Sequence, residues 1–480
     1  MLHKLKNRVF RPLDAAALGY LRIVFGGLMI FESGYYLYHW SQLADSQFFF
    51  SHAGFAWLPV LPHPGMYILG GIMALAAVLV TLGLWFRPAV AVLFVLGSWF
   101  FLLDVQHYNN HHYLYNLFAF LFIFTRADEY RSLRNLRNPA RREQCALVPA
   151  WQIGLFQFQL VVVYFFGALA KWNYDWLNGY AMKLWLPGRE LAFAQETMGP
   201  VVSSDFFINL TTYGGMGFDA IAGWCLLHRR LRWVILPPLI LFHLMNAYVW
   251  SIGSFPWVML LVTPLFFREY IRKGENWFAR KFESGPRPQL PDSARGRRNQ
   301  PPGVLARVEQ AFRRPRQKLV ITGIALYVAV QLLLPFRHYL YPGDVNFTGE
   351  GHYFAWRMML VSAMMPVKLS YYNEATQKWQ PIPLEDYINQ RQLRKSKRVP
   401  ANYIRFAKWF AEEELRKKRG YANPRVRARI PKSVNARRYF PVFSYQADLN
   451  RYTYHWFWPN RHFEAYDPSA EMGVSYGPGH

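Results

Sequence analysis

The sequence predicts an α-helical polytopic membrane domain of about nine transmembrane helices, followed by an extracytoplasmic α+β domain. Apolar segments recur along the 480-residue chain up to about Phe336, basic residues gather between them, and no long apolar run follows. A spanning helix needs roughly 20 mostly apolar residues. Nine segments approach this length, and they begin near Ala15, Met66, Ala89, Asn110, Trp151, Phe206, Trp233, Ser254 and Lys318.

Lysine and arginine predict the orientation of these spans. The N-terminal residues include Lys4, Lys6, Arg8 and Arg11, which places them on the cytoplasmic side, whereas loop 40–64 has neither residue type and is expected outside. The later basic loops alternate in agreement, so we expect a cytoplasmic N-terminus and an extracytoplasmic C-terminal domain. Because topogenic loops account for the net charge of +26, nucleic acid is not an expected partner; membrane lipid is.

The predicted domains are residues 1–335, which include a cytoplasmic basic linker at 268–317, and residues 336–480. In the second domain, alternating segments predict strands at Val367–Tyr372 and Arg438–Phe443, and Ile404–Lys418 predicts a helix. This domain has 23 Lys and Arg against 12 Asp and Glu, which favours an acidic partner. The alternative is a solvated surface that faces anionic lipid headgroups.

Polar residues at membrane depth gather toward the predicted outer side, where they would line a cavity between helix ends. They are Asp104, Asn109, Asn110, His111, His112, Lys171, His243 and Asn246. Each has a structural alternative. Lys171 could extend to the lipid headgroups, the asparagines and histidines could cap a helix, and His243 could bond to Asn246 between helices.

Three further features favour structural roles. Arg22 and Glu32 are too far apart along the first span to pair with each other. The run from His107 to His112 resembles one histidine box of membrane di-iron desaturases, but it stands alone and on the opposite side, so no metal is expected. Cys145 and Cys225 provide neither a disulfide framework nor zinc-ligand spacing.

Several separated motifs make the chain, from the first span to roughly Tyr372, resemble the vitamin K-dependent γ-glutamyl carboxylases and their prokaryotic homologues, which are HTTM-domain membrane proteins. The motifs are Phe101–Asp104, Asn109–His111, Tyr113–Tyr115, Val163–Phe165, Lys171, Asp175-Trp176, Gly179-Tyr180, Tyr213–Gly215 with Asp219 and Ala222-Gly223, His243–Asn246, Ser251–Gly253 and Tyr353–Met359.

The resemblance implies an enzyme, a lyase and hydroquinone epoxidase. Oxidation of a vitamin K hydroquinone (or menaquinol) by O2 would drive removal of a γ-proton from a peptide glutamate, and CO2 would then add to the carbanion. It implies that Lys171 and His111 are catalytic. It also implies that Asn110, Asn109, His243, Asn246 and Tyr164 lie at the cofactor, and that His352, Trp356 and Arg357 lie at the glutamate substrate. A lysine acts as a base only where its ammonium form is disfavoured, as in an apolar site.

The chain departs from the family in ways that affect substrate recognition. Ala170-Lys171 stands where animal members have two lysines, Gly351-His352 replaces a Leu-Tyr pair, and the extracytoplasmic disulfide cysteines and much of the propeptide-recognising region have no counterpart. These features favour a bacterial inner-membrane protein. Two alternatives stay open: a relative that keeps the fold without carboxylating glutamate, as in toxin-production proteins, and a transporter or channel.

Overall fold

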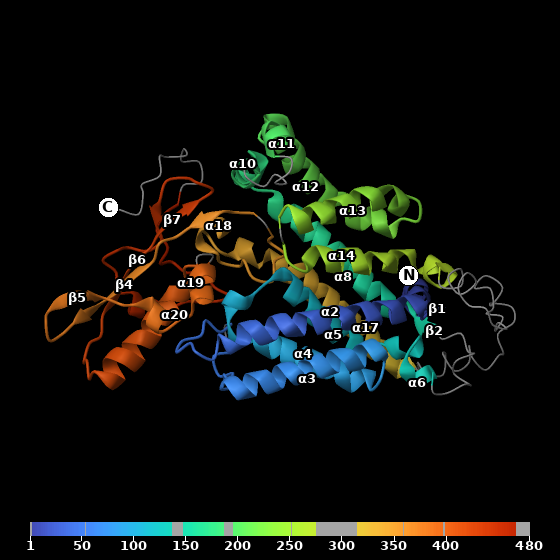
Figure 1. Ribbon diagram of the computed structural model, residues 1–480, viewed down its shortest axis with the longest axis horizontal. Helices are drawn as coiled ribbons and strands as arrows, with labels where there is room; N and C mark the ends of the chain where they lie inside the picture. The colour runs from blue at the N-terminus through green and yellow to red at the C-terminus, as the bar shows by residue number, and fades with distance from the viewer. Residues whose placement is uncertain are drawn as a thin grey trace.

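The chain folds into a bundle of helices with a mixed helix and strand domain at one end. The computed structural model describes residues 2–52, 54–136, 147–186, 195–250, 252–274, 314–358, 360–396 and 399–466. The helices of the bundle run along the long axis of the molecule, and the strand-containing C-terminal domain lies beyond one end of them (Figure 1). The N-terminus lies at the opposite end of the bundle (Figure 1).

A helix occurs at each of the nine predicted positions. These helices are α2 (Ala16–Ser41), α3 (His63–Leu82), α4 (Phe86–Leu103), α5 (Asn110–Ile123), α8 (Ala150–Lys171), α12 (Asp205–Leu227), α13 (Leu231–Tyr248), α14 (Phe255–Val262) and α17 (Arg314–Leu333). Short elements connect them: α1 (Leu2–Val9), η1 (Val105–His107), η2 (Ala127–Glu129), α6 (Leu133–Leu136), α9 (Tyr174–Leu177), α10 (Tyr180–Trp185), α11 (Gln195–Val202), η4 (Thr263–Phe267) and η5 (Leu334–Leu340).

Six of these helices, within the described residues, are long and apolar enough to cross a membrane, so the structure does not reproduce nine full spans. Helix α5 has 14 residues and α14 has 8 before the chain tightens into η4. Helix α12 has 23 residues but carries Asp205, Thr212 and Asp219. Several apolar helices thus mark a membrane protein, whereas the orientation stays a prediction, and residues 275–313 of the predicted linker lie outside the described residues.

A buried arginine joins three parts of the bundle. Arg22 of α2 is fully buried, and its guanidinium donates to the carbonyl oxygens of Val80 (2.8 Å) and Thr81 at the end of α3. It also donates to the carbonyl oxygens of Ala127 (3.2 Å), Tyr130 (3.3 Å) and Arg131 (2.7 Å), which follow α5. Because each donor direction is used on a carbonyl, Arg22 has a structural role, in agreement with the prediction.

The C-terminal domain is built from small antiparallel sheets and short helices. Its elements are α18 (Val345–Thr348), β3 (Ala363–Met364), β4 (Lys368–Asn373), β5 (Lys378–Pro381), η6 (Leu384–Asp386), α19 (Gln390–Lys395), α20 (Asn402–Trp409), η8 (Phe410–Lys418), β6 (Val426–Arg429), β7 (Pro431–Val434), β8 (Phe440–Pro441) and η9 (Leu449–Arg451). The sheets have the orders β3-β7-β8 and β5-β4-β6, and a third pairs β1 (Pro12–Asp14) with β2 (Leu147–Pro149).

The predicted mixed character of this domain is confirmed. The strand expected at Val367–Tyr372 is β4, and the helix expected at Ile404–Lys418 is α20 continued by η8. The second predicted strand shrinks to the two residues of β8. The domain rests on the ends of the bundle helices: Gln392 Nε2 donates to Asp104 Oδ2 (2.6 Å), and the Phe48 and Phe406 rings lie 5.3 Å apart. The polar residues at those helix ends therefore meet the C-terminal domain.

Candidate functional site

The last residue of α8 is a buried lysine that pairs with a carboxylate. Lys171 is 7% exposed, and its Nζ donates to Asp219 of α12, which is 6% exposed, and to the carbonyl oxygen of Gly167 (3.2 Å). Its ammonium also lies 5.3 Å from the Trp176 ring centroid. These contacts hold the side chain inside the protein and direct it away from the lipid headgroups that the structural alternative requires.

Gly167 lets three chain segments meet beside this ion pair. A Cβ on Gly167 would lie 3.4 Å from Asp219 Oδ2 and 3.7 Å from Met358 Cε. Helix α8, helix α12 and the segment after Arg357 therefore approach one another at one turn before Lys171. Asp219 was part of the family motif but received no predicted role, and only the fold shows that it is the partner of Lys171.

A tyrosine and a histidine lie on the same side of α8, two turns before Lys171. The Tyr164 hydroxyl and His243 Nε2 of α13 form a 2.8 Å hydrogen bond, and both side chains are buried. Among the described residues, His243 Nδ1 has no hydrogen-bond partner. Aromatic rings flank the pair, with Phe218 6.1 Å from Tyr164 and Phe242 5.3 Å from His243.

The structural alternative, a bond between His243 and Asn246, is not formed; His243 bonds to Tyr164. Asn246 lies almost one turn further along α13, and its carbonyl oxygen accepts from the Ile252 amide (3.3 Å). The structure thus brings Tyr164, Lys171 and His243 together around α8, and it places Asn246 at the end of α13 beside the following loop.

The start of α5 carries the cluster of asparagines and histidines. Asn109 is the N-cap residue, but its side chain makes no capping hydrogen bond, which leaves the capping alternative unsupported for this residue. Asn110 Oδ1 accepts from the Tyr108 hydroxyl (3.0 Å), and its Nδ2 donates to the Arg357 carbonyl oxygen (3.5 Å). Asn110 therefore joins α5 to the same segment that reaches Gly167 through Met358.

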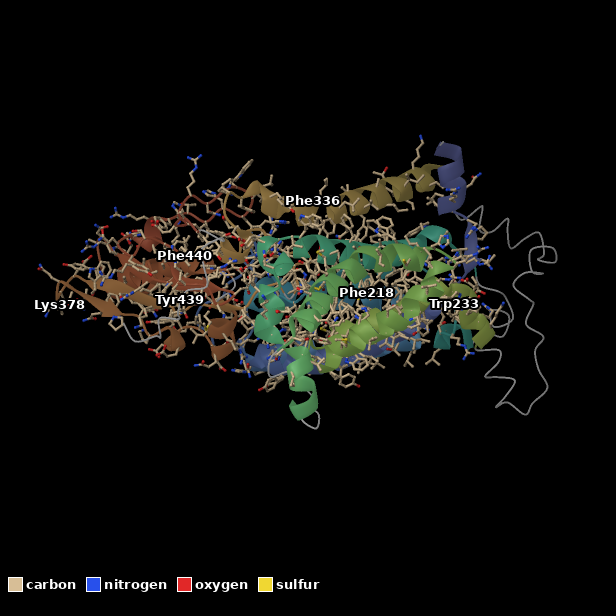
Figure 2. All side chains as sticks on the ribbon, turned by 90° about the horizontal axis from the view of Figure 1, so that it is seen from above. Phe218, Trp233, Phe336, Lys378, Tyr439 and Phe440 are labelled. Carbon is tan, nitrogen blue, oxygen red and sulfur yellow. The ribbon has the colours of Figure 1, made fainter. Side chains whose placement is uncertain are left out.

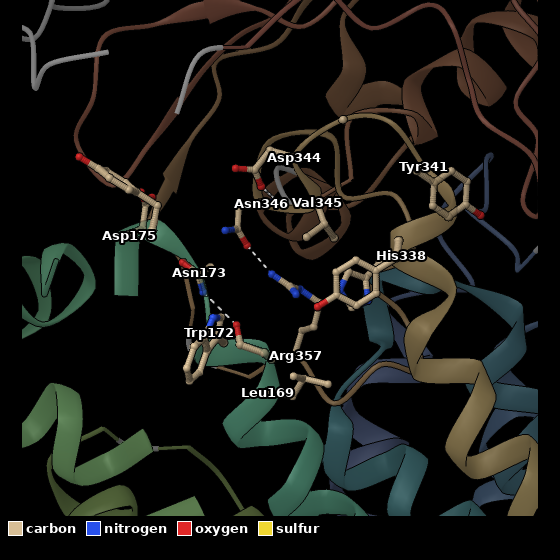
Figure 3. A pocket seen from close by; sticks show the side chains of 14 residues that line it. Leu169, Trp172, Asn173, Asp175, His338, Tyr341, Asp344, Val345, Asn346 and Arg357 are labelled. Carbon is tan, nitrogen blue, oxygen red and sulfur yellow. Dashed lines mark hydrogen bonds between the residues drawn. The ribbon is translucent and has the colours of Figure 1, made fainter. Parts of the chain in front are cut away.

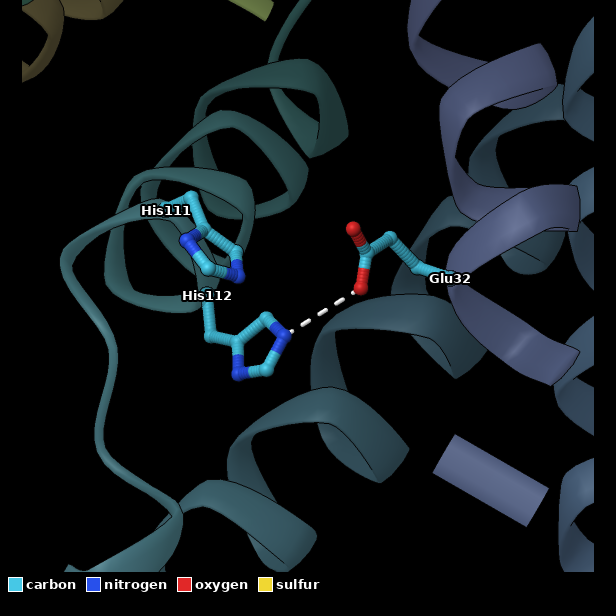
Figure 4. A group of neighbouring side chains, drawn as sticks. All are labelled: Glu32, His111 and His112. Atoms are coloured by element: carbon cyan, nitrogen blue, oxygen red, sulfur yellow. Dashed lines mark hydrogen bonds and ion pairs between the residues drawn. The ribbon is translucent and has the colours of Figure 1, made fainter. Parts of the chain in front are cut away.

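His111 lies in a polar cluster that the sequence did not indicate (Figure 4). His112 Nε2 and Glu32 Oε2 are 3.2 Å apart, and the other Glu32 oxygen accepts from Ser254, whose hydroxyl accepts from Tyr115 (3.1 Å). The ring centroids of His111 and His112 are 4.3 Å apart. Glu32 was predicted to be only structural; it bonds to His112, the neighbour of His111, at the start of α5.

Glu32, His111 and His112 could hold a metal ion, because one ligand atom from each lies within 4.8 Å of the others. Imidazole nitrogen and carboxylate oxygen are common ligands of Zn²⁺ and Fe²⁺. The existing partners of Glu32 account for the same arrangement as a hydrogen-bonded network, in which a carboxylate orients an imidazole.

The segment that follows Gly351 packs between the residues around α8 and those at the start of α5. The Phe354 amide donates to the Tyr108 hydroxyl (2.9 Å), and the fully buried Trp356 ring lies 4.9 Å from the Tyr113 ring. Trp356 therefore packs against α5. His352 contacts the Tyr353 ring at 5.8 Å and lies outside the residues that line the adjoining cavity.

A cavity of about 280 Å³ opens where this segment meets the end of α8 (Figure 3). It is lined by Leu169, Ala170, Trp172, Asn173, Tyr174, Asp175, His338, Tyr339, Tyr341, Gly343, Asp344, Val345, Asn346 and Arg357. Arg357 is 6% exposed and donates to Asn346 Oδ1 (2.7 Å), while its Nε lacks a partner among the described residues. Of the three residues expected at the substrate, only Arg357 lines the cavity.

The charges around this cavity are mostly compensated. Asp175 pairs with Arg437 (2.6 Å) and accepts from Asn435 (2.6 Å), and its burial raises the pKa of the carboxyl group. Burial lowers the pKa of the Arg357 guanidinium to about 10, so it stays cationic at neutral pH. A buried cation with an unused donor is suited to binding a carboxylate.

Comparisons with known proteins agree with the two-part structure. Residues 10–270 match the model of the HTTM domain, and residues 316–466 match the model of the vitamin K-dependent gamma-carboxylase lumenal domain. The second match begins within α17 and ends with the last described residue. No solved structure matches this chain.

Proposed function

This chain belongs to the vitamin K-dependent gamma-carboxylase family, and from that premise we propose that it carboxylates glutamate in a peptide substrate. The reaction would consume a reduced naphthoquinone, vitamin K hydroquinone or menaquinol, together with O2 and CO2. The proposed site lies on the extracytoplasmic side of a bacterial inner membrane, where the C-terminal domain meets the helix ends. The single observation that carries the proposal is the buried Lys171–Asp219 pair beside the cavity.

The pair supports a role for Lys171 as a base because Asp219 can take up its proton. When Oδ2 of Asp219 holds the proton, Nζ of Lys171 has a free lone pair and can accept a proton from a hydroxyl group brought against it. Both side chains are less than 10% exposed, which limits the access of bulk water to this proton. After the proton transfer, Lys171 and Asp219 are both neutral. Neither side chain is then left as an unpaired buried charge, which would be costly.

The residues around α8 fit a reduced quinone in their chemistry. His243 Nδ1 is an unused buried polar atom, and the Phe218 and Phe242 rings, 4.4 Å apart, offer flat apolar contacts beside it. We assign His243, Tyr164 and His111 to holding the quinol oxygens, with Asn110 and Asn109 at the start of α5 and Asn246 near the end of α13 beside them. When bound, the quinol supplies the reducing equivalents for O2 and the strong base that the glutamate requires.

Arg357 supports the assignment of the cavity to the glutamate side chain. Its guanidinium can pair with the γ-carboxylate in a bidentate manner, because Nε is unused and one NH2 group alone binds Asn346. Leu169 and Ala170, which directly precede Lys171, border the same cavity. His352 and Trp356 shape the segment that carries Arg357 and contact α5 through packing.

The test is carboxylation by purified protein in nanodiscs with vitamin K hydroquinone, O2, labelled bicarbonate and a short glutamate peptide. Wild type should fix label into peptide and form quinone epoxide, and Lys171→Ala should do neither. Lys183→Ala is the matched control, because Lys183 is an exposed lysine in α10. Fixation by Lys171→Ala at the wild-type rate would refute the role of Lys171. Folded wild type that yields neither product would favour the relative that keeps the fold without carboxylation.

A further inference from the structure

One face of the β5-β4-β6 sheet presents cations and aromatic rings together. Its register pairs Tyr372 with Trp379, Ser370 with both Pro381 and Arg427, and Lys368 with Arg429. Because alternate residues of a strand share a face, Lys368, Tyr372, Trp379, Arg427 and Arg429 lie on one side. These strands place no aspartate or glutamate on that side.

The arginines on this face lie against rings and are not used in ion pairs. The Arg425 guanidinium lies 3.9 Å from the Tyr372 centroid, and that of Arg427 lies 4.2 Å from the Trp379 centroid. The Arg429 guanidinium lies 5.6 Å from Tyr445. Within the described residues, no ion pair to a carboxylate involves Arg425, Arg427 or Arg429. Arg429 also hydrogen-bonds the Tyr445 hydroxyl. The ring contacts of Arg425 and Arg427 fix the guanidinium planes while N–H groups at their edges can still bind an anion.

Two carboxylates near the ends of these strands already have partners. Glu374 in the turn between β4 and β5 accepts from the Asn423 amide (3.2 Å). Asp448 accepts from the Val426 amide (3.0 Å) and pairs with Arg451 (3.0 Å). The strands carry cations and no carboxylate on this face, so the face would attract a polyanion.

The position of the sheet argues against lipid as that polyanion. Strand β5 lies at the end of the molecule farthest from the helix bundle (Figure 1). Lys378, the first residue of β5, and Trp233 of α13 lie toward opposite ends of the molecule (Figure 2). A headgroup layer around the helices would lie a whole domain away. Electrostatic attraction between exposed groups decays within about 8–10 Å at physiological salt.

We propose that this face docks an acidic segment of the polypeptide substrate while a glutamate of the same chain occupies the cavity. This inference rests on the proposed function. Carboxylation replaces a γ-C–H bond with a C–C bond to CO2 and releases the proton, so each turnover adds one negative charge to the docked chain. The face should then hold a partly modified substrate more tightly than an unmodified one.

The experiment measures peptide binding by fluorescence anisotropy on the full-length protein in nanodiscs of zwitterionic lipid, without quinol. The probes are a glutamate-rich 20-residue peptide, its γ-carboxyglutamate form and its glutamine form. Binding should follow the order γ-carboxyglutamate, glutamate, glutamine, and Arg427→Glu/Arg429→Glu should weaken binding of the glutamate peptide by roughly tenfold or more at low salt.

Two variants control for total charge and for folding. Arg416→Glu/Lys417→Glu makes the same charge change on η8, which packs on the opposite side of the sheet through the Tyr371–Phe410 contact of 5.8 Å. It should weaken binding much less. Arg427→Lys/Arg429→Lys keeps the charge and should bind nearly as wild type does, whereas Arg427→Glu/Arg429→Glu must keep the wild-type tryptophan fluorescence for its loss of binding to count.

Three results would overturn the inference: equal binding of the glutamine peptide, equal weakening by both charge reversals, or charge-dependent capture of phosphatidylglycerol vesicles without peptide binding. Failure of the proposed function has a different signature. The glutamate peptide would then dock through this face but incorporate no label when quinol, O2 and bicarbonate are supplied.

Discussion

Replacing Lys171 with methionine tests the buried ion pair directly. Methionine keeps the apolar length of the side chain, but it leaves the Asp219 carboxylate without the partner that the structure gives it. Breaking a buried pair by removing one partner typically destabilises a protein by about 3–5 kcal/mol. No discount for solvent screening applies, because both side chains are less than 10% exposed.

Protonation of Asp219 sets an upper limit on this cost and gives it a pH dependence. An aspartic acid with the ordinary pKa of about 3.9 costs about 4 kcal/mol to protonate at pH 7 and about 1.5 kcal/mol at pH 5. The unpaired carboxylate can escape by taking up a proton, so the loss of stability should shrink as the pH falls. We therefore expect Lys171→Met to lose about 4 kcal/mol at pH 7 and about 1.5 kcal/mol at pH 5.

The assay is reversible unfolding of the purified protein in mixed micelles, followed by tryptophan fluorescence as the fraction of SDS is raised. The double variant Lys171→Met/Asp219→Leu should return to within about 1 kcal/mol of wild type, because replacing both members of a buried pair with apolar groups is often neutral. The reasoning fails if the single variant loses under about 1 kcal/mol at pH 7. It also fails if the loss is the same at both pH values.

Three further predictions concern other parts of the chain. Burial lowers the pKa of Lys432 to about 7. The unfolded chain therefore binds one more proton between pH 7 and about pH 10, and stability should rise by about 2 kcal/mol from pH 7 to pH 8.5 in urea titrations. A flat profile for wild type, or the same rise in Lys432→Met, would contradict this. Gly351→Ala should lower the unfolding free energy by at least about 3 kcal/mol, because the φ angle is +71° and the new Cβ would lie 2.5 Å from His338 Cα. The control Gly420→Ala has the same φ with open space around it and should cost only about 1 kcal/mol, so equal melting temperatures for the two would refute the steric cause. His243→Ala should weaken quinol binding by about 5–150-fold in equilibrium titration, which corresponds to one buried hydrogen bond of about 1–3 kcal/mol, while Asn246→Ala should change it less; the reverse order would move the quinol site away from α13.

The helix positions could be predicted because apolar runs and basic loops are local features of the sequence. The number of full spans could not, because apolar composition continues past the point where a helix ends. The run that starts at Phe255 is interrupted after Val262, where the chain becomes a 3-10 turn containing Pro264. Helix α5 ends at Ile123, although Phe124 continues its apolar pattern. The sequence shows where helices begin more clearly than it shows how deep they reach.

Some residues of the candidate site could also be predicted from the sequence, and others could not. Lys171, His111 and Arg357 were found through motifs that belong to single segments. Asp219 and Glu32 were not assigned, because each acts through a residue distant in the chain: Asp219 is 48 residues from Lys171, and Glu32 is 80 residues from His112. From the sequence, Arg22 was the only ion-pair partner that we considered for Glu32. A pairing between helices becomes visible only once their packing is known.

The five carbonyl bonds of Arg22 have a consequence for biosynthesis. A lone arginine at the centre of a spanning helix raises the free energy of insertion into a bilayer by about 2.5–3.5 kcal/mol, and Arg22, in the second turn of α2, carries part of this cost. Its acceptors, Val80 to Arg131, leave the ribosome long after α2 does. The first helix can complete these bonds only after about residue 131 has been made, so we expect α2 to stay beside the translocon until then. We therefore expect the first 131 residues to assemble as one unit, which the carbonyl bonds of Arg22 hold together.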